Sequence, residues 1–255
     1  MTARRIYGVH AVRAVLARRP DAVVRALVLD EAAGGRLADL VAELGSRGIE
    51  IERTDRHELD RLTGGAAHQG IVVESAAEAE FTLTDFEELV VSRGSDARLL
   101  VLDGVEDPRN LGACLRTADA AGIDAVVVPR SRAAKLTPAA RKVATGAAET
   151  LPMLSAPSLP KVLRWLRSAG VRVVGADAGG QPLYDVALEP PVALVLGGEG
   201  RGLKPSTRDA CDALAAIPMH GTVESLNVSV AAAIMMYEVV RRVPPGQASA
   251  GRRPA

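Results

Sequence analysis

Two loops of the sequence place polar side chains among glycines, each directly after an apolar stretch that is typical of a buried strand. The segment VLDGVEDPRNLGACLR (101–116) carries Asn110 and Arg116 in a predicted helix. The segment LVLGGEGRGLKP (194–205) surrounds Glu199 with four glycines. A helix N-terminus attracts negative charge, an arginine pairs with phosphate, and glycines let a ligand approach the backbone. The first loop therefore suits a phosphate, and the second suits a ligand that lies close to the backbone.

A third loop, which begins IPMHGTVESLNV at residue 217, carries Ser225 and Asn227 before a long apolar helix. In open parallel sheets, ligands bind outside the carboxyl ends of the strands, so three such loops favour one shared site. Each residue also has a plainer interpretation. Asn110, Ser225 or Asn227 would serve as an ordinary helix N-cap, Arg116 as a solvated or ion-paired arginine, and Glu199 as a turn residue.

The spacing of the other reactive residues excludes several kinds of site. The glycines fit neither the dinucleotide fingerprint nor the P-loop, and no loop contains a GxSxG nucleophile elbow. Cys114 and Cys211 are far apart, and the four histidines lack ligand spacing, so we expect no disulfide framework and no metal site. His68, in AAHQGIVVE, is interpreted as a turn or core histidine. This use of cysteine is typical of a reducing cytosol, so we expect a cytoplasmic protein.

The elements that must position these loops form two α/β units. In residues 1–78 the patterns predict strands at 23–30, 49–53 and 70–75 and helices at 8–19, 35–47 and 55–62. In residues 98–243 they predict strands at 98–103, 125–129, 171–176, 192–197 and 213–217, and helices at 109–121, 138–147, 158–169 and 226–241. The second rhythm is typical of a largely parallel sheet.

The remaining segments connect or end these units. Residues 79–97 hold five acids and one arginine and are predicted to be a linker with one helical turn. Residues 244–255 are predicted to be a disordered tail. No signal peptide and no membrane span are predicted.

At the three loops the sequence resembles the SpoU/TrmH family of RNA ribose 2'-O-methyltransferases. The three motifs of that family correspond to NLGACLR (110–116), LVLGGEGRGL (194–203) and IPMHGTVESLNVSVAAAI (217–234), with order and separation intact. YGVHAV (7–12) and HQGIVV (68–73) are similar to the subgroup that methylates a guanosine in 23S ribosomal RNA. The resemblance covers the chain up to about residue 243.

The resemblance implies a fold and an assembly. The carboxyl-terminal domain would be an α/β SPOUT methyltransferase domain with a deep trefoil knot, one of the rare exceptions to the rule that chains do not knot. The small amino-terminal domain would be a ribosomal-protein-like α/β module that binds RNA. The protein would be an obligate homodimer with its site at the interface, and helix 226–241 would contribute to that interface.

The resemblance also implies the cofactor S-adenosyl-L-methionine, held by loops 197–202 and 217–228. Gly197, Ile217 and Leu226 would contact it, chiefly through backbone groups and apolar packing. The loops would form the knot and hold the cofactor in a bent conformation.

The family assigns activation of the ribose hydroxyl to Arg116, assisted by the phosphate of the target nucleotide. A guanidinium has a pKa above about 12 and stays protonated, so we expect Arg116 to orient and stabilise the developing alkoxide. Asn110, Glu199, Ser225 and Asn227 would organise the site. Glu199 would order the glycine loop or pair with an arginine, and Ser225 and Asn227 would place the ribose or the knot loop.

Two other functions fit the same motifs. One is 2'-O-methylation of transfer RNA or of an antibiotic-target site in ribosomal RNA. The other, from a different class, is a non-catalytic RNA-binding factor in ribosome assembly that has retained the fold.

The charge pattern bears on RNA binding. The chain has 31 basic and 31 acidic residues, but residues 98–243 hold 17 basic and 14 acidic residues. Five of the basic residues follow one predicted strand without an intervening acid: Arg130, Arg132, Lys135, Arg141 and Lys142. They form either a solvated connection or, as we expect, a patch that contacts phosphates. Only 2% of the residues are aromatic, which favours recognition by backbone charge and RNA shape over base stacking.

Overall fold

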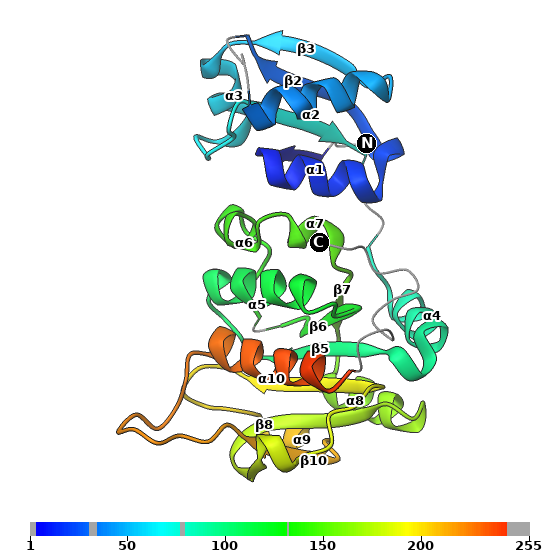
Figure 1. Ribbon diagram of the computed structural model, residues 1–255, viewed down its shortest axis with the longest axis vertical. Helices are drawn as coiled ribbons and strands as arrows, with labels where there is room; N and C mark the ends of the chain where they lie inside the picture. The colour runs from blue at the N-terminus through cyan, green and yellow to red at the C-terminus, as the bar shows by residue number, and fades with distance from the viewer. Residues whose placement is uncertain (1–3, 31–34, 77–79, 132, 244–255) are drawn as a thin grey trace. The chain divides into compact units, whose positions relative to one another are not determined.

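The computed structural model describes residues 4–30, 35–76, 80–131 and 133–243, and these residues form two compact units (Figure 1). The amino-terminal unit extends to Glu80 and also includes Thr145–Thr150. The carboxyl-terminal unit comprises Phe81–Ala144 and the chain from Leu151 onward. The predicted tail, 244–255, lies outside the described residues.

The amino-terminal unit is a mixed four-stranded sheet in the order β1-β4-β2-β3. Strands β2 and β3 are parallel, whereas β4 runs antiparallel to both β1 and β2. The strands are β1 (Arg4–Tyr7), β2 (Val23–Leu29), β3 (Glu50–Thr54) and β4 (Ile71–Ser75), and the helices are α1 (Val9–Arg18), η1 (Pro20–Ala22), α2 (Gly35–Ser46) and α3 (Arg56–Thr63). Apolar residues of α1 and α2 pack against the sheet. Every strand and helix predicted here is present, and β1 and the short helix η1 are additional.

The turn His68–Gly70, which precedes β4, is bound to the start of α1. The buried His68 accepts a hydrogen bond at Nδ1 from the amide of Gly70, 3.1 Å away, and its Nε2 lies 3.3 Å from the Asp60 carboxylate. Gln69 accepts a hydrogen bond at Oε1 from the amide of Val9, 2.9 Å away, and so binds the first turn of α1. The interpretation of His68 as a turn or core histidine is confirmed.

The carboxyl-terminal unit is a six-stranded sheet in the order β10-β8-β9-β5-β6-β7, parallel throughout. Its strands are β5 (Arg98–Asp103), β6 (Ala125–Pro129), β7 (Met153–Ala156), β8 (Arg172–Pro182), β9 (Val192–Gly197) and β10 (Ala213–Ala216). Its helices are α4 (Leu83–Arg93), η2 (Gly94–Asp96), α5 (Pro108–Ala120), α6 (Pro138–Ala144), α8 (Leu159–Ser168), η3 (Leu183–Asp185), α9 (Pro205–Arg208) and α10 (Val228–Arg242). The predicted α/β fold with a parallel sheet is confirmed, and the trefoil knot stays a prediction.

Helices cover both faces of this sheet, as a parallel sheet requires. Alternate residues of β5 to β9 join α4 and α8 in one apolar core. On the other face α5 and α10 pack against each other, and α10 also packs on β9. Among the described residues, no helix is long and apolar enough to cross a membrane.

The structure differs from the sequence prediction in residues 79–97. We expected a linker with one helical turn, but α4 is an 11-residue helix of the carboxyl-terminal unit. Thr82 caps it in a capping box with Asp85, and Phe86 and Val90 are buried in the core. The many acids of the segment hid an amphipathic helix, on which Asp85 and Glu88 are exposed while Phe86 and Val90 are buried.

A second difference concerns the predicted helix at 138–147. It is two helices, α6 and α7 (Ala147–Thr150), because Thr145 and Gly146 both adopt positive φ, 52° and 97°. Such values end an α-helix. Helix α7 packs on α1, and its Glu149 forms an ion pair with Arg4, so this short stretch belongs to the amino-terminal unit.

Replacing Phe86 with alanine tests whether α4 is part of the core. Phe86 is fully buried and its ring lies 6.1 Å from the ring of Trp165, so we expect Phe86→Ala to lower the free energy of unfolding by about 3 to 5 kcal/mol. Urea unfolding followed by circular dichroism measures this. Val91→Ala is the matched control, since Val91 lies on the same helix and is 72% exposed. Equal effects of the two substitutions would show that α4 is only a linker.

Candidate functional site

The three loops predicted from the sequence lie at one edge of the parallel sheet. They follow β5, β9 and β10, whose carboxyl ends all point the same way because the sheet is parallel throughout. The last residues of β5 and β9, Asp103 and Gly197, are direct partners in the ladder. The loop after β5 leads into α5, and the loop after β10 leads into α10.

The glycine loop, defined here as residues 197–204, lies directly on the backbone of the loop after β5. A Cβ atom on Gly198 would lie 2.2 Å from the carbonyl oxygen of Gly104, and one on Gly197 would lie 2.0 Å from the carbonyl carbon of Gly202. Neither position has room for a side chain. The loop turns back on itself through a bridge between Gly198 and Gly202, with the Gly202 amide 3.1 Å from the Gly198 carbonyl oxygen.

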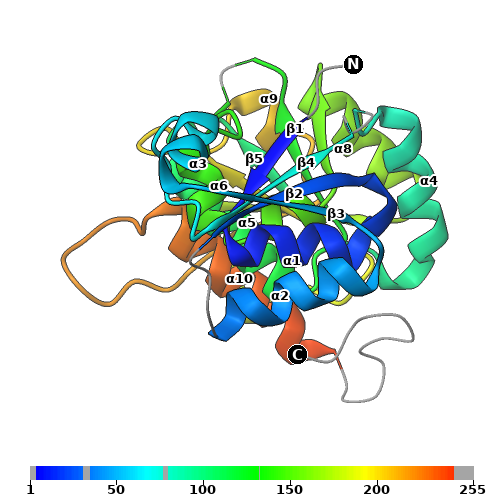
Figure 2. The same ribbon diagram turned by 90° about the horizontal axis from the view of Figure 1, so that it is seen from above.

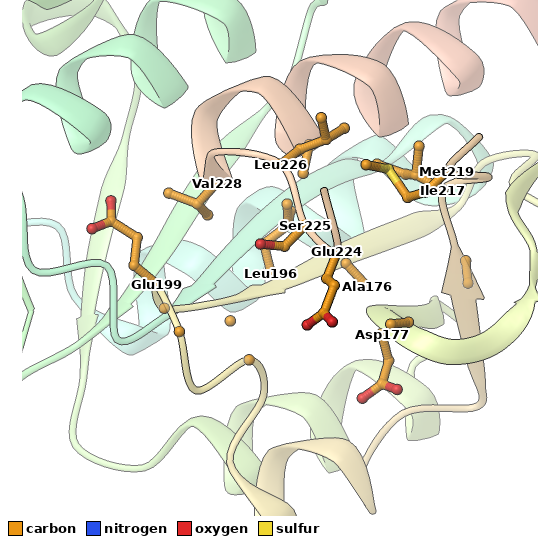
Figure 3. A pocket seen from close by; sticks show the side chains of 17 residues that line it. Ala176, Asp177, Leu196, Glu199, Ile217, Met219, Glu224, Ser225, Leu226 and Val228 are labelled. Atoms are coloured by element: carbon orange, nitrogen blue, oxygen red, sulfur yellow. The ribbon is translucent and has the colours of Figure 1, made fainter. Parts of the chain in front are cut away.

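A pocket of about 460 Å³ opens beside this loop (Figure 3). Residues of four segments surround it: the outer part of β8, the glycine loop, the end of β10, and the loop and first turn of α10. The lining residues are Ala176–Ala178, Leu196–Gly200, Gly202, Ala215, Ile217, Met219, Glu224–Leu226, Val228 and Ala231. Five residues singled out in the sequence are among them: Gly197, Glu199, Ile217, Ser225 and Leu226.

The chemical character of the pocket is divided. Figure 3 shows Ile217, Met219 and Leu226 together at one end, with the carboxylates of Asp177 and Glu224 directed away from that end. Asp177 forms an ion pair with Arg208, with Oδ2 and Nη1 3.3 Å apart. Glu224 makes no hydrogen bond or ion pair with any described residue. The pocket therefore offers an apolar surface, exposed glycine backbone and negative charge.

A chain of side-chain hydrogen bonds links all three loops. The Asn110 side-chain amide donates to Glu199 Oε1, and the Asn227 amide donates to Asn110 Oδ1 at 3.1 Å. Asn227 Oδ1 accepts hydrogen bonds from the amide and the hydroxyl of Ser229 at 2.8 and 2.6 Å. Glu199 thus binds Asn110, and no described arginine forms an ion pair with it.

Of the three residues that could have been helix N-caps, the structure makes only one a cap. Asn227 is the N-cap of α10, so it caps a helix and joins the hydrogen-bond chain at once. Asn110 is not a cap: Asp107 is the N-cap of α5 and accepts the Arg109 amide at 2.8 Å. Ser225 is exposed, lines the pocket and does not cap α10.

Arg116 lies on α5 with its side chain exposed. It makes no hydrogen bond or ion pair with any described residue, and it does not line the pocket. The structure of one chain therefore does not bring Arg116 together with the other predicted site residues. Its guanidinium is available to an external anion.

The predicted basic patch lies along the segment that follows β6. Arg130, Lys135 and Lys142 are exposed, and Arg141 is half-buried. Arg132 lies outside the described residues. Lys142 and Arg141 stand on the last turn of α6.

The two thiols do not belong to the site. Burial raises the pKa of Cys114 to about 12 and that of Cys211 to about 11. Both thiols therefore stay protonated at neutral pH and are poor nucleophiles. Within the described ranges, no group of three His, Cys, Asp or Glu residues is arranged to hold a metal ion.

Several pocket residues were not singled out from the sequence. Ala176–Ala178 belong to the outer part of β8, which we expected to end at 176, and Met219 and Glu224 stand in the third loop but were not singled out. The run GADAGG was the available signal, because it follows a buried strand as the other loops do.

Comparison with protein families matches both units. Residues 97–237 match the SpoU rRNA Methylase family, and residues 5–80 match a family described as RNA 2'-O ribose methyltransferase substrate binding.

Curated proteins similar to the chain include the 23S rRNA (guanosine-2'-O-)-methyltransferases RlmB of Haemophilus influenzae and Escherichia coli K12. The first is 45% identical over 239 residues, 93% of this chain and 97% of the relative. The second is 43% identical over 238 residues, 93% of this chain and 98% of the relative. Both similarities extend across the two units.

Solved structures show the same architecture. One is the SpoU methyltransferase AviRb from Streptomyces viridochromogenes in complex with the cofactor AdoMet, with a TM-score of 0.76, 26% identity, and coverage of 94% of this chain and 90% of that one. Another is an RNA 2'-O ribose methyltransferase, with a TM-score of 0.72, 27% identity, and coverage of 94% and 88%.

Proposed function

The chain belongs to the SpoU rRNA methylase family, and we propose that it transfers a methyl group from S-adenosylmethionine to the ribose 2'-hydroxyl of a guanosine in 23S ribosomal RNA. The observation that carries this proposal is the similarity, over both units, to relatives that are named for that reaction. The reaction takes place on ribosomal RNA, so we propose that the protein acts in the cytoplasm.

The pocket beside the glycine loop suits the cofactor. Its volume of about 460 Å³ is typical of a cofactor site, and its apolar end, formed by Ile217, Met219 and Leu226, suits an adenine ring. Gly197 has no room for a side chain and exposes its backbone to a ligand. S-adenosylmethionine carries a net positive charge, which the carboxylates of Asp177 and Glu224 complement. These features support Gly197, Ile217 and Leu226 as cofactor contacts.

When bound, S-adenosylmethionine supplies a methyl group on a positively charged sulfur, which is a good leaving group. The protein must then align the ribose hydroxyl and help its proton to leave. We assign Arg116 to the nucleotide side of this reaction, where its guanidinium stabilises the developing alkoxide and the neighbouring phosphate. The exposed, unpaired side chain of Arg116 supports this role, since it has no competing carboxylate among the described residues.

The hydrogen-bonded residues hold the site in shape. Asn110 fixes Glu199 and thereby the glycine loop, and Asn227 fixes Asn110 while it starts α10. Ser225 presents its hydroxyl to the pocket, where we propose that it positions the ribose. A site built in advance in this way does not have to reorganise during the reaction.

RNA binding is assigned to two regions. The amino-terminal unit matches a family named for substrate binding, which supports its role in RNA recognition. In the carboxyl-terminal unit, Arg130, Arg132, Lys135, Arg141 and Lys142 would contact phosphates. The exposed side chains of Arg130, Lys135 and Lys142 support this assignment.

We propose that two copies of the chain form a homodimer through α10. Val230, Ile234 and Tyr237 recur at helical spacing on one face of α10, and Val230 and Tyr237 are 47% and 51% exposed. The loop between β10 and α10 extends away from the rest of its unit in both views and carries Val223, which is 61% exposed (Figures 1 and 2). A second copy would cover these apolar surfaces and would bring its own Arg116 near this site.

Replacing Arg116 tests its assigned role in methyl transfer. In cells that lack the protein, wild-type chain should restore 2'-O-methylation of the target guanosine, and Arg116→Ala should not. Arg116→Lys should also largely fail, because a point charge does not replace a planar guanidinium. Ribose-methylation mapping of ribosomal RNA is the measurement. Cofactor binding and dimerisation should remain near wild type in the purified variants, and near-normal methylation by Arg116→Ala would refute its assigned role.

Charge reversal in the basic patch tests whether these residues contact RNA phosphates. Exchanging Arg130 and Lys142 for glutamate should weaken binding of ribosomal RNA fragments. The slope of log affinity against log salt concentration should become shallower by about 0.7 to 0.9 for each phosphate that the protein no longer neutralises. Filter binding at several salt concentrations gives the slope. Arg172→Glu is the control, since Arg172 is exposed at the opposite, amino end of β8. An unchanged slope would place the RNA elsewhere.

A charge introduced on α10 tests the proposed homodimer interface. Tyr237→Glu should convert a dimer to a monomer, because it places a charge in the proposed apolar interface. Size-exclusion chromatography with light scattering measures the mass. Val91→Glu adds the same charge at an exposed apolar position on α4 and should leave the dimer intact. A monomeric wild-type protein, or a dimeric Tyr237→Glu variant, would contradict the proposed interface.

A further inference from the structure

Asp103 is a buried carboxylate at the carboxyl end of β5, and its side chain is 1% exposed. A charge removed from water requires a partner of opposite charge or several hydrogen bonds. Lys204 supplies both. Its Nζ lies 2.7 Å from Asp103 Oδ1, and its backbone amide donates to Oδ2 at 3.2 Å. One residue, 101 positions further along the chain, therefore occupies both oxygens.

Asp103 holds the glycine loop at both of its ends. Its backbone is the ladder partner of Gly197, where the loop begins, and its side chain binds Lys204, where the loop ends. Between these two points the loop is closed on itself by the bridge from Gly198 to Gly202. Pro205 follows immediately and starts α9. Asp103 thus fixes the distance between the two ends of the glycine loop.

The packing under the loop makes that span critical. The backbone of Gly198 lies on the Gly104 carbonyl with no room for a Cβ atom, so a small rise of the loop breaks this contact. Gly104 itself has φ of 89°, and a Cβ on it would stand 3.8 Å from Lys204 Nζ. The ammonium group therefore lies over the same turn on which the loop rests.

We propose that the ion pair between Asp103 and Lys204 positions the glycine loop for cofactor binding. The inference rests on the proposed function and adds two residues to its site. Neither residue lines the pocket, so both act through the loop, whose Gly197, Gly198 and Gly200 form one wall. The pair also holds Glu199 in reach of Asn110. They are positioning residues and not catalytic residues.

The test uses the purified full-length chain and three substitutions. Asp103→Asn and Lys204→Met should each weaken S-adenosylmethionine binding, measured by isothermal titration calorimetry, by about tenfold or more. The double variant should bind no more weakly than the weaker single variant, because the two side chains act as one unit. Lys204→Arg should recover most of the affinity, since it restores the positive charge.

A second ion pair of the same unit provides the control. Arg167 Nε lies 2.6 Å from Asp212 Oδ1, and Asp212 Oδ2 accepts the backbone amide of Val173 at 2.9 Å, so this carboxylate also binds one basic side chain and one amide, away from the pocket. Arg167→Met should leave cofactor affinity unchanged. Thermal unfolding of all variants shows whether a change of affinity merely follows a change of stability.

Failure of the positioning role and failure of the proposed function give different results in this experiment. If the wild-type chain binds the cofactor and Lys204→Met binds it equally well, the positioning role is refuted and the proposed function stands. The same conclusion follows if Arg167→Met weakens binding as much as Lys204→Met, or if Lys204→Arg does not recover it. If Asp103→Asn does not fold, the comparison of Lys204→Met with Lys204→Arg decides. A wild-type chain that does not bind S-adenosylmethionine refutes both proposals.

Discussion

Gly197 and Gly198 bring two stretches of backbone into direct contact, and the rest of the site is arranged around that contact. No residue with a side chain fits at either position, because the neighbouring atoms are backbone atoms that cannot move aside. The close approach depends on the parallel sheet, which sets β5 beside β9 and turns both loops to the same edge. Once the loops touch, Asp103 reaches Lys204, and Glu199 reaches Asn110.

Asn227 caps a helix and joins the hydrogen-bond chain at the same time, so these two uses of its side chain are not alternatives. Asn227 accepts from Ser229 through its side-chain oxygen and donates to Asn110 through its side-chain nitrogen. An aspartate would cap α10 equally well but has no donor for Asn110. The amide side chain is therefore explained by the site, although the helix alone explains why a polar residue stands there. The same reasoning applies to Asn110, which accepts from one loop and donates to another.

Sequence patterns were sufficient to predict five of the six strands of the parallel sheet, the helices α5 and α10, and the edge at which the loops meet, but they missed the short strand β7 and the short helix α9. Strands with an uninterrupted apolar centre, such as 98–103 and 192–197, were predicted to the residue because both of their faces are buried. Helix α4 was missed because its acidic composition concealed Phe86 and Val90 at helical spacing. The position of Arg116 relative to the pocket was beyond sequence reasoning, since it depends on how α5 is rotated and on which chains surround it. The Asp103 and Lys204 pair was equally hidden, because it joins residues 101 positions apart.

The turn that holds His68 brings the two amino-terminal motifs, YGVHAV and HQGIVV, into contact with each other. The Gln69 side chain occupies the space above Gly8, where a Cβ atom would lie 3.2 Å from Oε1, and it binds the amide of Val9. Gly8 and Gln69 thus belong to one packing arrangement, although 61 positions separate them in the chain. Gly8 also has φ of 87°, so a residue with a side chain would be strained at this position whatever stands at position 69. Their joint presence therefore identifies a way of starting α1, and a subgroup signature of this kind need not touch RNA at all.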